Sequence, residues 1–422
     1  MAAPLRTAAT TAAASSSKFV PRAVFEVSPS ITRSYFLGHH AGALASMRKS
    51  LSNIGLILEC RDSRVPLTST NPLLESSLAG RDRIVVYTKA DLCAPGSATR
   101  WLEKQQHLLS EWHSSQAHGG VFGDHGSPDE EGDGGDGGRR GAAADADDDD
   151  GAGLSSGRTE VVFTDERNPR SIQKLLDRIR ARAAATHSLT GLRALVVGMP
   201  NAGKSTLLNA LRRVGLQLPK AARTGAQPGV TRKMSTPVRI IDGTEPSTAG
   251  TSADAGAAGA FVVDTPGVFV PYVGDVEAML KLSLVGCVKD GLVPAETIAD
   301  YLLFRLNLLD PSAYGEFCPP TNDAAEFLEA VARRTGKLLR GGVPGTEQAA
   351  DWVVQQWRKG TLGRFGLDDV SEENLRRLAR RAAEGGGESN LSMNQARRQE
   401  KEARKARSKA KRAAAGDGGQ GG

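Results

Sequence analysis

A glycine-rich segment at residues 198–205 has the residue types and the spacing of a phosphate-binding loop. Its sequence, GMPNAGKS, matches the pattern G-x-x-x-x-G-K-[ST], and the apolar run RALVV precedes it. Glycines let backbone N–H groups face phosphate oxygens, and Lys204 would bring a positive charge to the β- and γ-phosphates. The alternative, a glycine-rich turn with an exposed lysine, does not explain the strand and helix patterns on either side. The residues predicted to bind the phosphates are Asn201, Ala202, Gly203, Lys204, Ser205 and Thr206.

Two further motifs offer ligands for a magnesium ion beside the phosphates. The segment DTPG closes an apolar run at residues 261–264, where Asp264 can hold Mg²⁺ through water and the amide of Gly267 can meet a γ-phosphate. The segment PGVT ends in Thr231, whose hydroxyl can cap both Mg²⁺ and the γ-phosphate. Together with the P-loop hydroxyl, the predicted Mg²⁺ ligands are Ser205, Thr231 and Asp264.

The segment TKAD at residues 88–91 carries the features of a base-reading loop, because it follows the apolar run RIVVY. A carboxylate at Asp91 can accept hydrogen bonds from N1–H and from the 2-amino group of guanine. Adenine offers neither donor, so Asp91 predicts GTP as the nucleotide. TKAD or DTPG alone would be weak evidence, but all four motifs in one chain, each after a suitable element, indicate a GTPase. The base-binding residues predicted here are Thr88, Lys89, Ala90 and Asp91.

These motifs require a sheet that brings them to one edge. Short runs rich in Val and Ile predict strands at residues 54–60, 83–87, 161–164, 195–198, 237–241 and 261–264. Helical patterns lie between several of them, at residues 98–111, 169–184 and 205–214. Strands that alternate with helices predict an α/β fold with a mostly parallel sheet covered on both faces. Because the base-reading motif precedes the P-loop in the chain, we expect a circularly permuted P-loop GTPase domain with six strands.

The chain divides into regions of different composition. We expect the GTPase domain at residues 31–271, interrupted by low-complexity inserts at 114–157 and 243–259. Apolar residues at spacings of three and four predict helices at 276–288, 294–306, 323–335 and 347–359. These helices define a second, helical domain at 272–380, which the DTPG strand enters directly. Loss of the γ-phosphate at Gly267 could therefore pull on the helical domain.

The charge distribution indicates a polyanionic partner and an organellar address. The net charge is +6, although residues 124–150 alone hold 11 acidic residues, and a basic stretch occupies the tail at 381–422. Residues 1–30 contain almost no acid and many Ala, Ser and Thr, which is typical of a transit peptide. A merely disordered start is the alternative. The sequence has no apolar run of roughly 20 residues that would predict a transmembrane segment. Its four isolated cysteines argue against a zinc ribbon or a disulfide scaffold.

The motifs together resemble the circularly permuted GTPases of the YlqF/RbgA type, and among these the mitochondrial ribosome-associated branch of fungi. The resemblance runs from residue 35 to residue 368. It includes FLGH, RDSRVP (similar to the D-A-R-x-P of the family), TKAD, GMPNAGKST, PGVT, DTPG, LSLVGCVKD and IADYLL. Thr88 replaces the usual Asn, which removes one contact to the base, and Leu37 replaces a common Pro.

The resemblance implies an assembly factor that hydrolyses GTP slowly until a ribosomal particle stimulates it. Its implied partner is the mitochondrial large ribosomal subunit with its rRNA, rather than DNA. The implied location is the mitochondrial matrix, with peripheral association with the inner membrane as an additional expectation. Two alternatives stay open: an RNA-binding structural protein for which GTP is only a ligand, and a nucleolar factor for cytosolic ribosomes. The acid-free first 25 residues argue against the nucleolar alternative.

The resemblance also assigns two roles close to the γ-phosphate. Many GTPases place a Gln after the D-x-x-G motif to orient the attacking water, but here that residue is Val268. The histidine of the FLGH segment, His39, is the catalytic residue that the resemblance implies, with His40 its immediate neighbour. Asn201 would hold a K⁺ ion through its side-chain oxygen, and this ion would neutralise charge in the transition state. A loop asparagine that satisfies only backbone groups is the alternative.

Overall fold

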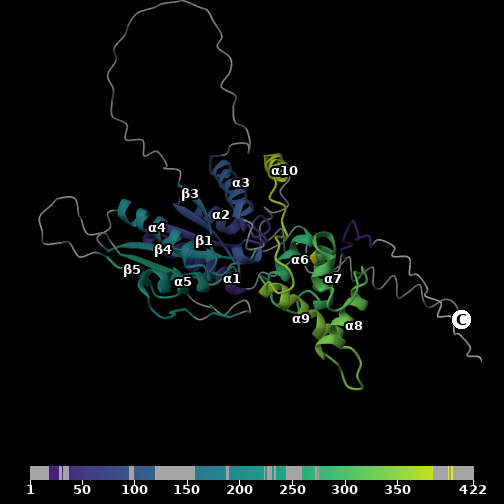
Figure 1. The fold of residues 1–422 in the computed structure, drawn as a ribbon. Helices are drawn as coiled ribbons and strands as arrows, with labels where there is room; N and C mark the ends of the chain where they lie inside the picture. The colour runs from purple at the N-terminus through teal and green to yellow at the C-terminus, as the bar shows by residue number, and fades with distance from the viewer. Residues whose placement is uncertain are drawn as a thin grey trace, which may run out of the picture.

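A computed structural model describes residues 19–27, 31, 38–94, 99–118, 157–186, 190–222, 224–225, 231, 234–243, 259–270, 273, 275–383, 398 and 401–402. Most of the predicted leader, most of both predicted inserts, residues 228–230 of the PGVT motif and most of the predicted tail lie outside these ranges. Residues 114–118, predicted as the start of the first insert, belong instead to the end of a helix, Thr99–His118. In Figure 1 an α/β part adjoins a part built only from helices. Within the described ranges, every helix is too short or too polar to cross a lipid bilayer.

The α/β part is built on a six-stranded sheet with the order β3-β2-β1-β4-β6-β5. Four of the five strand pairs are parallel, and only β5 pairs antiparallel, with β6 at one edge. All seven residues of β1 are buried, as expected for a strand covered on both faces. The predicted mostly parallel sheet of six strands is therefore confirmed. The strands are β1 Leu56–Asp62, β2 Arg83–Thr88, β3 Thr159–Phe163, β4 Leu192–Gly198, β5 Val238–Ile241 and β6 Ala260–Asp264.

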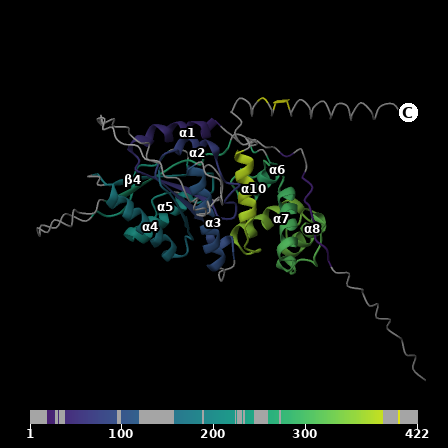
Figure 2. The ribbon, with the colours of Figure 1, turned by 90° about the horizontal axis from the view of Figure 1, so that it is seen from above.

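Helices cover both faces of this sheet. One face packs through Ile57, Leu195 and their neighbours against α1 and α2, and through Tyr87 and Val161 against α3. The opposite face packs through Leu58, Val196 and other aliphatic side chains against α4 and α5, and Figure 2 shows these two helices across the sheet from α1 and α2. The bounds of these helices are α1 Gly38–Ser50, α2 Pro72–Leu78, α3 Thr99–His118, α4 Pro169–Ala185 and α5 Lys204–Leu216.

The helical part has a core of its own. The predicted helices are present as α6 Val276–Leu284, α7 Ala295–Leu309, α8 Ala324–Thr335 and α9 Thr346–Lys359. The prediction that the first of them extends to residue 288 was wrong, because α6 ends at Leu284. Its end is set by Gly286, whose φ of +84° is unfavourable for other residues and redirects the chain. The turn that follows α6 therefore leaves the carbonyl of Gly286 available outside the helix.

The chain returns to the sheet after the helical part. Helix α10, Glu372–Ala383, packs through Leu375 and Ala379 against the side chains of Tyr87 and Leu109. In both views α10 lies next to α3, although the helical part separates them in the sequence (Figures 1 and 2). The carboxylate of Asp368, just before α10, accepts hydrogen bonds from the amides of Leu67 and Thr68 at 2.9 and 2.8 Å. The segment after α9 thus ties the two parts together.

Candidate nucleotide-binding site

The P-loop lies between the central strand β4 and helix α5. Lys204 is buried, and its ammonium donates a hydrogen bond to the Met199 carbonyl of the same loop at 2.7 Å. Burial lowers the pKa of Lys204, and the nearby Asp264 carboxylate partly counteracts that effect. The DTPG segment is fixed against this loop, because the amide of Val268 donates to the Gly198 carbonyl at 3.1 Å. A phosphate bound in the loop would provide the counter-charge that a buried ammonium requires.

Three oxygen-bearing side chains meet beside the P-loop lysine. The hydroxyl of Ser205 donates to Oδ2 of Asp264 at 2.6 Å and lies 3.2 Å from the hydroxyl of Thr231. In the described part of the chain, the other carboxylate oxygen, Asp264 Oδ1, is buried without a hydrogen-bond partner. Burial raises the pKa of Asp264, against the opposing influence of the Ser205 hydrogen bond. Because Mg²⁺ prefers oxygen ligands, this cluster with its unsatisfied carboxylate oxygen fits the predicted ion.

The base-reading motif begins at the carboxyl end of β2 and contacts the P-loop directly. The hydroxyl of Thr88 donates to the Ala202 carbonyl at 2.9 Å. The ammonium of Lys89 donates to the Asn201 carbonyl at 2.8 Å. Lys89 has a φ of +58°, a left-handed conformation that directs its side chain back over the loop. The two loops therefore form one wall, with phosphate-binding groups at one end and base-binding groups at the other.

Two adjoining cavities follow this wall. A cavity of about 320 Å³ is lined by the phosphate-side residues Lys204, Ser205, Thr231 and Gly267 among others. A second cavity of about 260 Å³ is lined by Thr88, Asp91 and the missed residue Thr164. Lys89, Gly203 and Thr206 line both cavities. Their arrangement suits a nucleotide with its phosphates in the first cavity and its base in the second.

Asp91 lies half-buried at the base-side cavity. Burial raises the pKa of Asp91, and the carboxylate of Asp165 adds to that rise. The guanidinium of Arg167 lies 3.9 Å from the Asp91 carboxylate and opposes the rise. The amide of Ala90 donates to the carbonyl of Thr164 at 3.1 Å, which fixes the base motif to the end of β3. Thr164 directly follows β3, the parallel neighbour of β2. Because ligands bind at the carboxyl ends of parallel strands, this position was the only signal in the sequence that Thr164 lies at the site.

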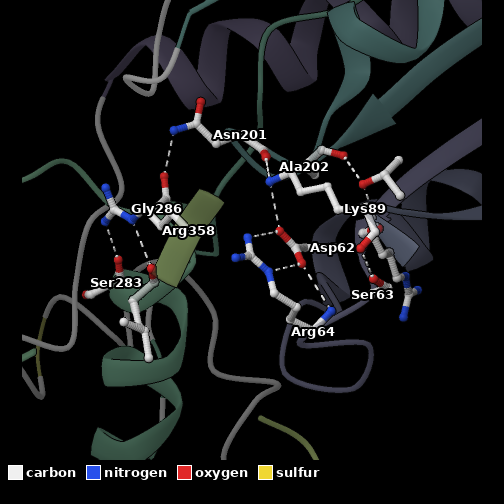
Figure 3. A network of polar contacts seen from close by, with 12 residues as sticks. Asp62, Ser63, Arg64, Lys89, Asn201, Ala202, Ser283, Gly286 and Arg358 are labelled. Atoms are coloured by element: carbon white, nitrogen blue, oxygen red, sulfur yellow. Dashed lines mark hydrogen bonds and ion pairs between the residues drawn. The ribbon is translucent and has the colours of Figure 1, made fainter. Parts of the chain in front are cut away.

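Asp62 was not foreseen as a site residue, although it lies in the RDSRVP segment. It ends β1, is fully buried, and accepts hydrogen bonds from Arg64 Nε at 2.9 Å and Nη2 at 2.7 Å. The ammonium of Lys89 donates to the same carboxylate at 2.8 Å, and Figure 3 shows Asp62 between the two cations. Burial alone raises the pKa of Asp62, but attraction to Arg64 and Lys89 outweighs burial and holds this pKa well below its usual range.

Asn201 connects the P-loop to the helical part. Its side-chain amide donates to the Gly286 carbonyl at 2.7 Å, and its backbone has a φ of +56°. In Figure 3 the amide nitrogen of Asn201 points toward Gly286, beside the Arg358 side chain from α9. The use of the Asn201 side-chain oxygen for K⁺ stays a prediction. The same holds for the catalytic role of His39, which lies in the first turn of α1 with its side chain outside the described part.

The order of the motifs along the chain now defines the class of protein. The phosphate loop follows β4 at the centre of the sheet, and the base-reading loop follows β2, which comes earlier in the chain. A sheet with one antiparallel edge strand and these two loops at its carboxyl edge is a circularly permuted P-loop GTPase domain. A family model described as "50S ribosome-binding GTPase" matches residues 193–314.

Known proteins resemble the chain over most of its length. "Mitochondrial GTPase 1" of Schizosaccharomyces japonicus is 33% identical over 352 residues, which are 80% of this chain and 91% of that protein. "Mitochondrial GTPase 1" of Schizosaccharomyces pombe is 33% identical over 85% of this chain and 95% of its own length. "Mitochondrial ribosome-associated GTPase 1" of Xenopus tropicalis is 27% identical over 79% of this chain and 94% of its own length. The chain belongs to this family of mitochondrial GTPases.

Proposed function

We propose that the chain binds and hydrolyses GTP as an assembly factor for the mitochondrial large ribosomal subunit, and so supports mitochondrial translation. The observation that carries the proposal is the cluster of Ser205, Thr231 and Asp264 beside the buried Lys204. An unsatisfied carboxylate oxygen next to two hydroxyls and a lysine is suited to a nucleotide phosphate with its Mg²⁺. The partner is supported by the names of a relative, "Mitochondrial ribosome-associated GTPase 1", and of the matching family, "50S ribosome-binding GTPase".

In this proposal the residues of the chain bind and orient the nucleotide. Lys204 attracts the β- and γ-phosphates, and the amide of Gly267 meets the γ-phosphate. Bound Mg²⁺ would neutralise phosphate charge, and Ser205, Thr231 and Asp264 are the residues that would hold it. Asp91 accepts the two guanine donors. The reaction is an attack of water on the γ-phosphate, which yields GDP and inorganic phosphate.

Water activation requires a residue other than Val268. The Val268 side chain is buried and contains no hydrogen-bonding group. We assign the role to His39, at the start of α1, because a histidine can accept or orient a proton near neutral pH. The side-chain oxygen of Asn201 would hold K⁺, and this ion would add positive charge beside the transition state. Equal hydrolysis rates in KCl and NaCl would remove this part of the proposal.

The rRNA contact belongs to the helical domain, residues 272–380, and to the basic tail, residues 381–422. Helix α10, where these two regions meet, contributes an arginine-rich surface. One residue in three of its sequence, EENLRRLARRAA, is an arginine. Such cations bind phosphates without reading bases, so we expect an affinity that falls with salt. Deletion of residues 397–412 should weaken binding to large-subunit rRNA and flatten its salt dependence.

We place the protein in the mitochondrial matrix, with peripheral binding to the inner membrane as a finer expectation. The composition of residues 1–30 supports import. Part of that segment is also folded against α7, where Arg22 pairs with Asp300 at 2.5 Å and Phe25 packs on Tyr301. Cleavage of a transit peptide before residue 19 would retain these contacts. A fusion of residues 1–35 to a fluorescent reporter tests the compartment, and carbonate extraction of mitochondria tests the membrane association.

The decisive test measures GTP turnover with and without purified mitochondrial large-subunit particles. The proposal expects a low basal rate, a clear increase with large-subunit particles, and no increase with small-subunit particles. Lys204→Ala should abolish nucleotide binding while the variant still unfolds cooperatively. GTP binding without any stimulation would favour an RNA-binding protein that uses GTP only as a ligand.

A further inference from the structure

The last turn of α9 reaches the nucleotide site from the helical part. Arg358 and Lys359 are consecutive residues there, and both line the phosphate-side cavity as well as the base-side cavity. On the opposite wall, the residues shared by the two cavities are Lys89, Gly203 and Thr206. The end of α9 therefore lies where the cavities adjoin, which is the place expected for the ribose and the first phosphates of a nucleotide.

Several contacts hold this turn in position. Trp357 is buried beneath the guanidinium of Arg64, at 4.7 Å from the ring centroid. Arg358 donates to the carbonyls of Leu284 at 2.9 Å and Ser283 at 2.8 Å. The turn ends at Gly360, where a Cβ atom would come within 2.7 Å of a methyl group of Leu92 in the base-reading loop. The packing of α9 thus fixes its end against both nucleotide-binding loops.

Among the described residues, Lys359 has no counter-charge, whereas the neighbouring Arg358 lies 3.2 Å from Asp290. The Lys359 side chain is exposed, and within the described residues it forms no hydrogen bond or ion pair. Nη1 of the buried Arg64, which also lines the phosphate-side cavity, likewise lacks a hydrogen-bond partner in the described part. Arg64 is paired with Asp62 through its other nitrogens, so its Nη1 and the ammonium of Lys359 are the donors left to face the cavity. Such donors are suited to a ligand that carries several negative charges.

We propose that Lys359 binds the phosphate chain of the nucleotide, so that the helical domain supplies a cation to the GTP site. The proposal rests on the nucleotide site described above and adds to it a residue outside the GTPase domain. Nucleotide then bridges the two parts of the chain. The coupling between the nucleotide and α9 is reciprocal. Bound nucleotide favours the docked position of α9 by a certain factor, and displacing the end of α9 weakens nucleotide binding by the same factor. The competing explanation is that Lys359 only offsets the negative end of the α9 helix dipole.

The test compares the affinities of full-length variants for guanosine, GDP and GTP by competition against a fluorescent GDP derivative. Lys359→Met should weaken GDP and GTP binding by about tenfold, the effect of losing one charge-assisted hydrogen bond, and leave guanosine binding unchanged. Lys359→Arg should retain most of the affinity. The matched control is Lys104→Met, which removes the same charge from an exposed position on α3. It should bind all three ligands like the wild type.

Three outcomes would overturn the inference. Equal GDP affinity of Lys359→Met and the wild type would leave Lys359 as a helix-end cation. An equal loss for guanosine and GDP would assign Lys359 to the ribose or the base. An equal loss in Lys104→Met would assign the effect to the overall charge of the protein. If the wild type itself binds neither GDP nor GTP, the nucleotide site fails, and this result is distinct from the other three.

Discussion

The guanidinium of Arg64 stacks on the indole of Trp357, with its central carbon 4.7 Å from the ring centroid. Both side chains are almost completely buried, with exposed fractions of 1%. Arg64 also forms a two-pronged ion pair with Asp62, and Asp62 binds the ammonium of Lys89 in the base-reading loop. A continuous series of contacts therefore runs from the base-reading loop through β1 to helix α9.

Arg64→Met should destabilise the protein strongly. The substitution removes one of the two cations at a fully buried carboxylate, and the loss of one partner of a buried ion pair costs roughly 3–5 kcal/mol. Urea unfolding monitored by tryptophan fluorescence measures this loss. The control is Arg333→Met, which breaks an exposed pair with Glu329 on α8 and should cost at most about 1 kcal/mol. Similar losses in the two variants would contradict a stabilising role of Arg64.

Asp62 should govern part of the acid sensitivity of folding. Its pKa is held below the usual range, so its contribution to stability is present above the unfolded-state pKa of about 4 and is lost as pH falls through the lower folded-state pKa. Asp62→Asn removes this contribution. The difference in unfolding free energy between the wild type and the variant should be largest near neutral pH and shrink below about pH 4. A difference that stays constant across this pH range would show that the ionisation of Asp62 does not contribute to the acid sensitivity of folding.

Asp91→Asn should change the choice of base. The substitution replaces a carboxylate, which can accept both guanine donors, by an amide that offers a donor of its own. GTP affinity should fall at least about 100-fold, because each hydrogen bond to a charged group contributes roughly 1.5–3 kcal/mol. Xanthosine triphosphate, which has a carbonyl where guanine has its amino group, should bind better than to the wild type. An unchanged preference for GTP over ATP would exclude Asp91 as the selecting residue.

Asp264→Asn should uncouple nucleotide binding from Mg²⁺. In the wild type, added Mg²⁺ should tighten GTP binding. In the variant, the Mg²⁺ affinity should be about 10- to 100-fold lower, as is common when a group that holds a metal through water is lost. Since burial raises the pKa of Asp264, protons should compete with Mg²⁺ from a higher pH than at an ordinary aspartate, so Mg²⁺ binding should weaken as the pH falls. Asp242→Asn, an exposed position after β5, is the control and should respond to Mg²⁺ like the wild type.

The sheet could be predicted from the sequence because its strands are nearly continuous apolar runs with loops of known chemistry at their ends. Helix α1 gave no such signal, since GHHAGALASMRKS is rich in small residues and shows almost no separation of apolar and polar faces. Helix α2 has only seven residues and depends on Asn71, whose side chain caps the amide of Leu73. Short and weakly amphipathic helices take their stability from tertiary packing, which a local pattern does not record.

Site residues could be predicted where a single continuous motif contains the functional groups. They could not be predicted where two segments that are distant in the sequence meet. The P-loop and the base-reading loop have fixed spacings, so Lys204 and Asp91 could be named from the sequence. Arg358 and Lys359 are ordinary basic residues in the last turn of a helix, where the helix dipole already explains them. Their position at the nucleotide cavities depends on the packing of α9 against residues nearly 300 positions away in the chain.

His39→Ala should separate binding from catalysis. Val268 cannot orient water, and a histidine at the start of α1 could do so once the ribosomal particle repositions that region, so hydrolysis would depend on docking. Single-turnover GTP hydrolysis with large-subunit particles should slow by about 100-fold or more in the variant, the usual contribution of a general base. GTP affinity and particle binding should stay unchanged. His40→Ala, the neighbouring control, should keep the stimulated rate, and a full stimulated rate in both variants would place catalysis in another residue.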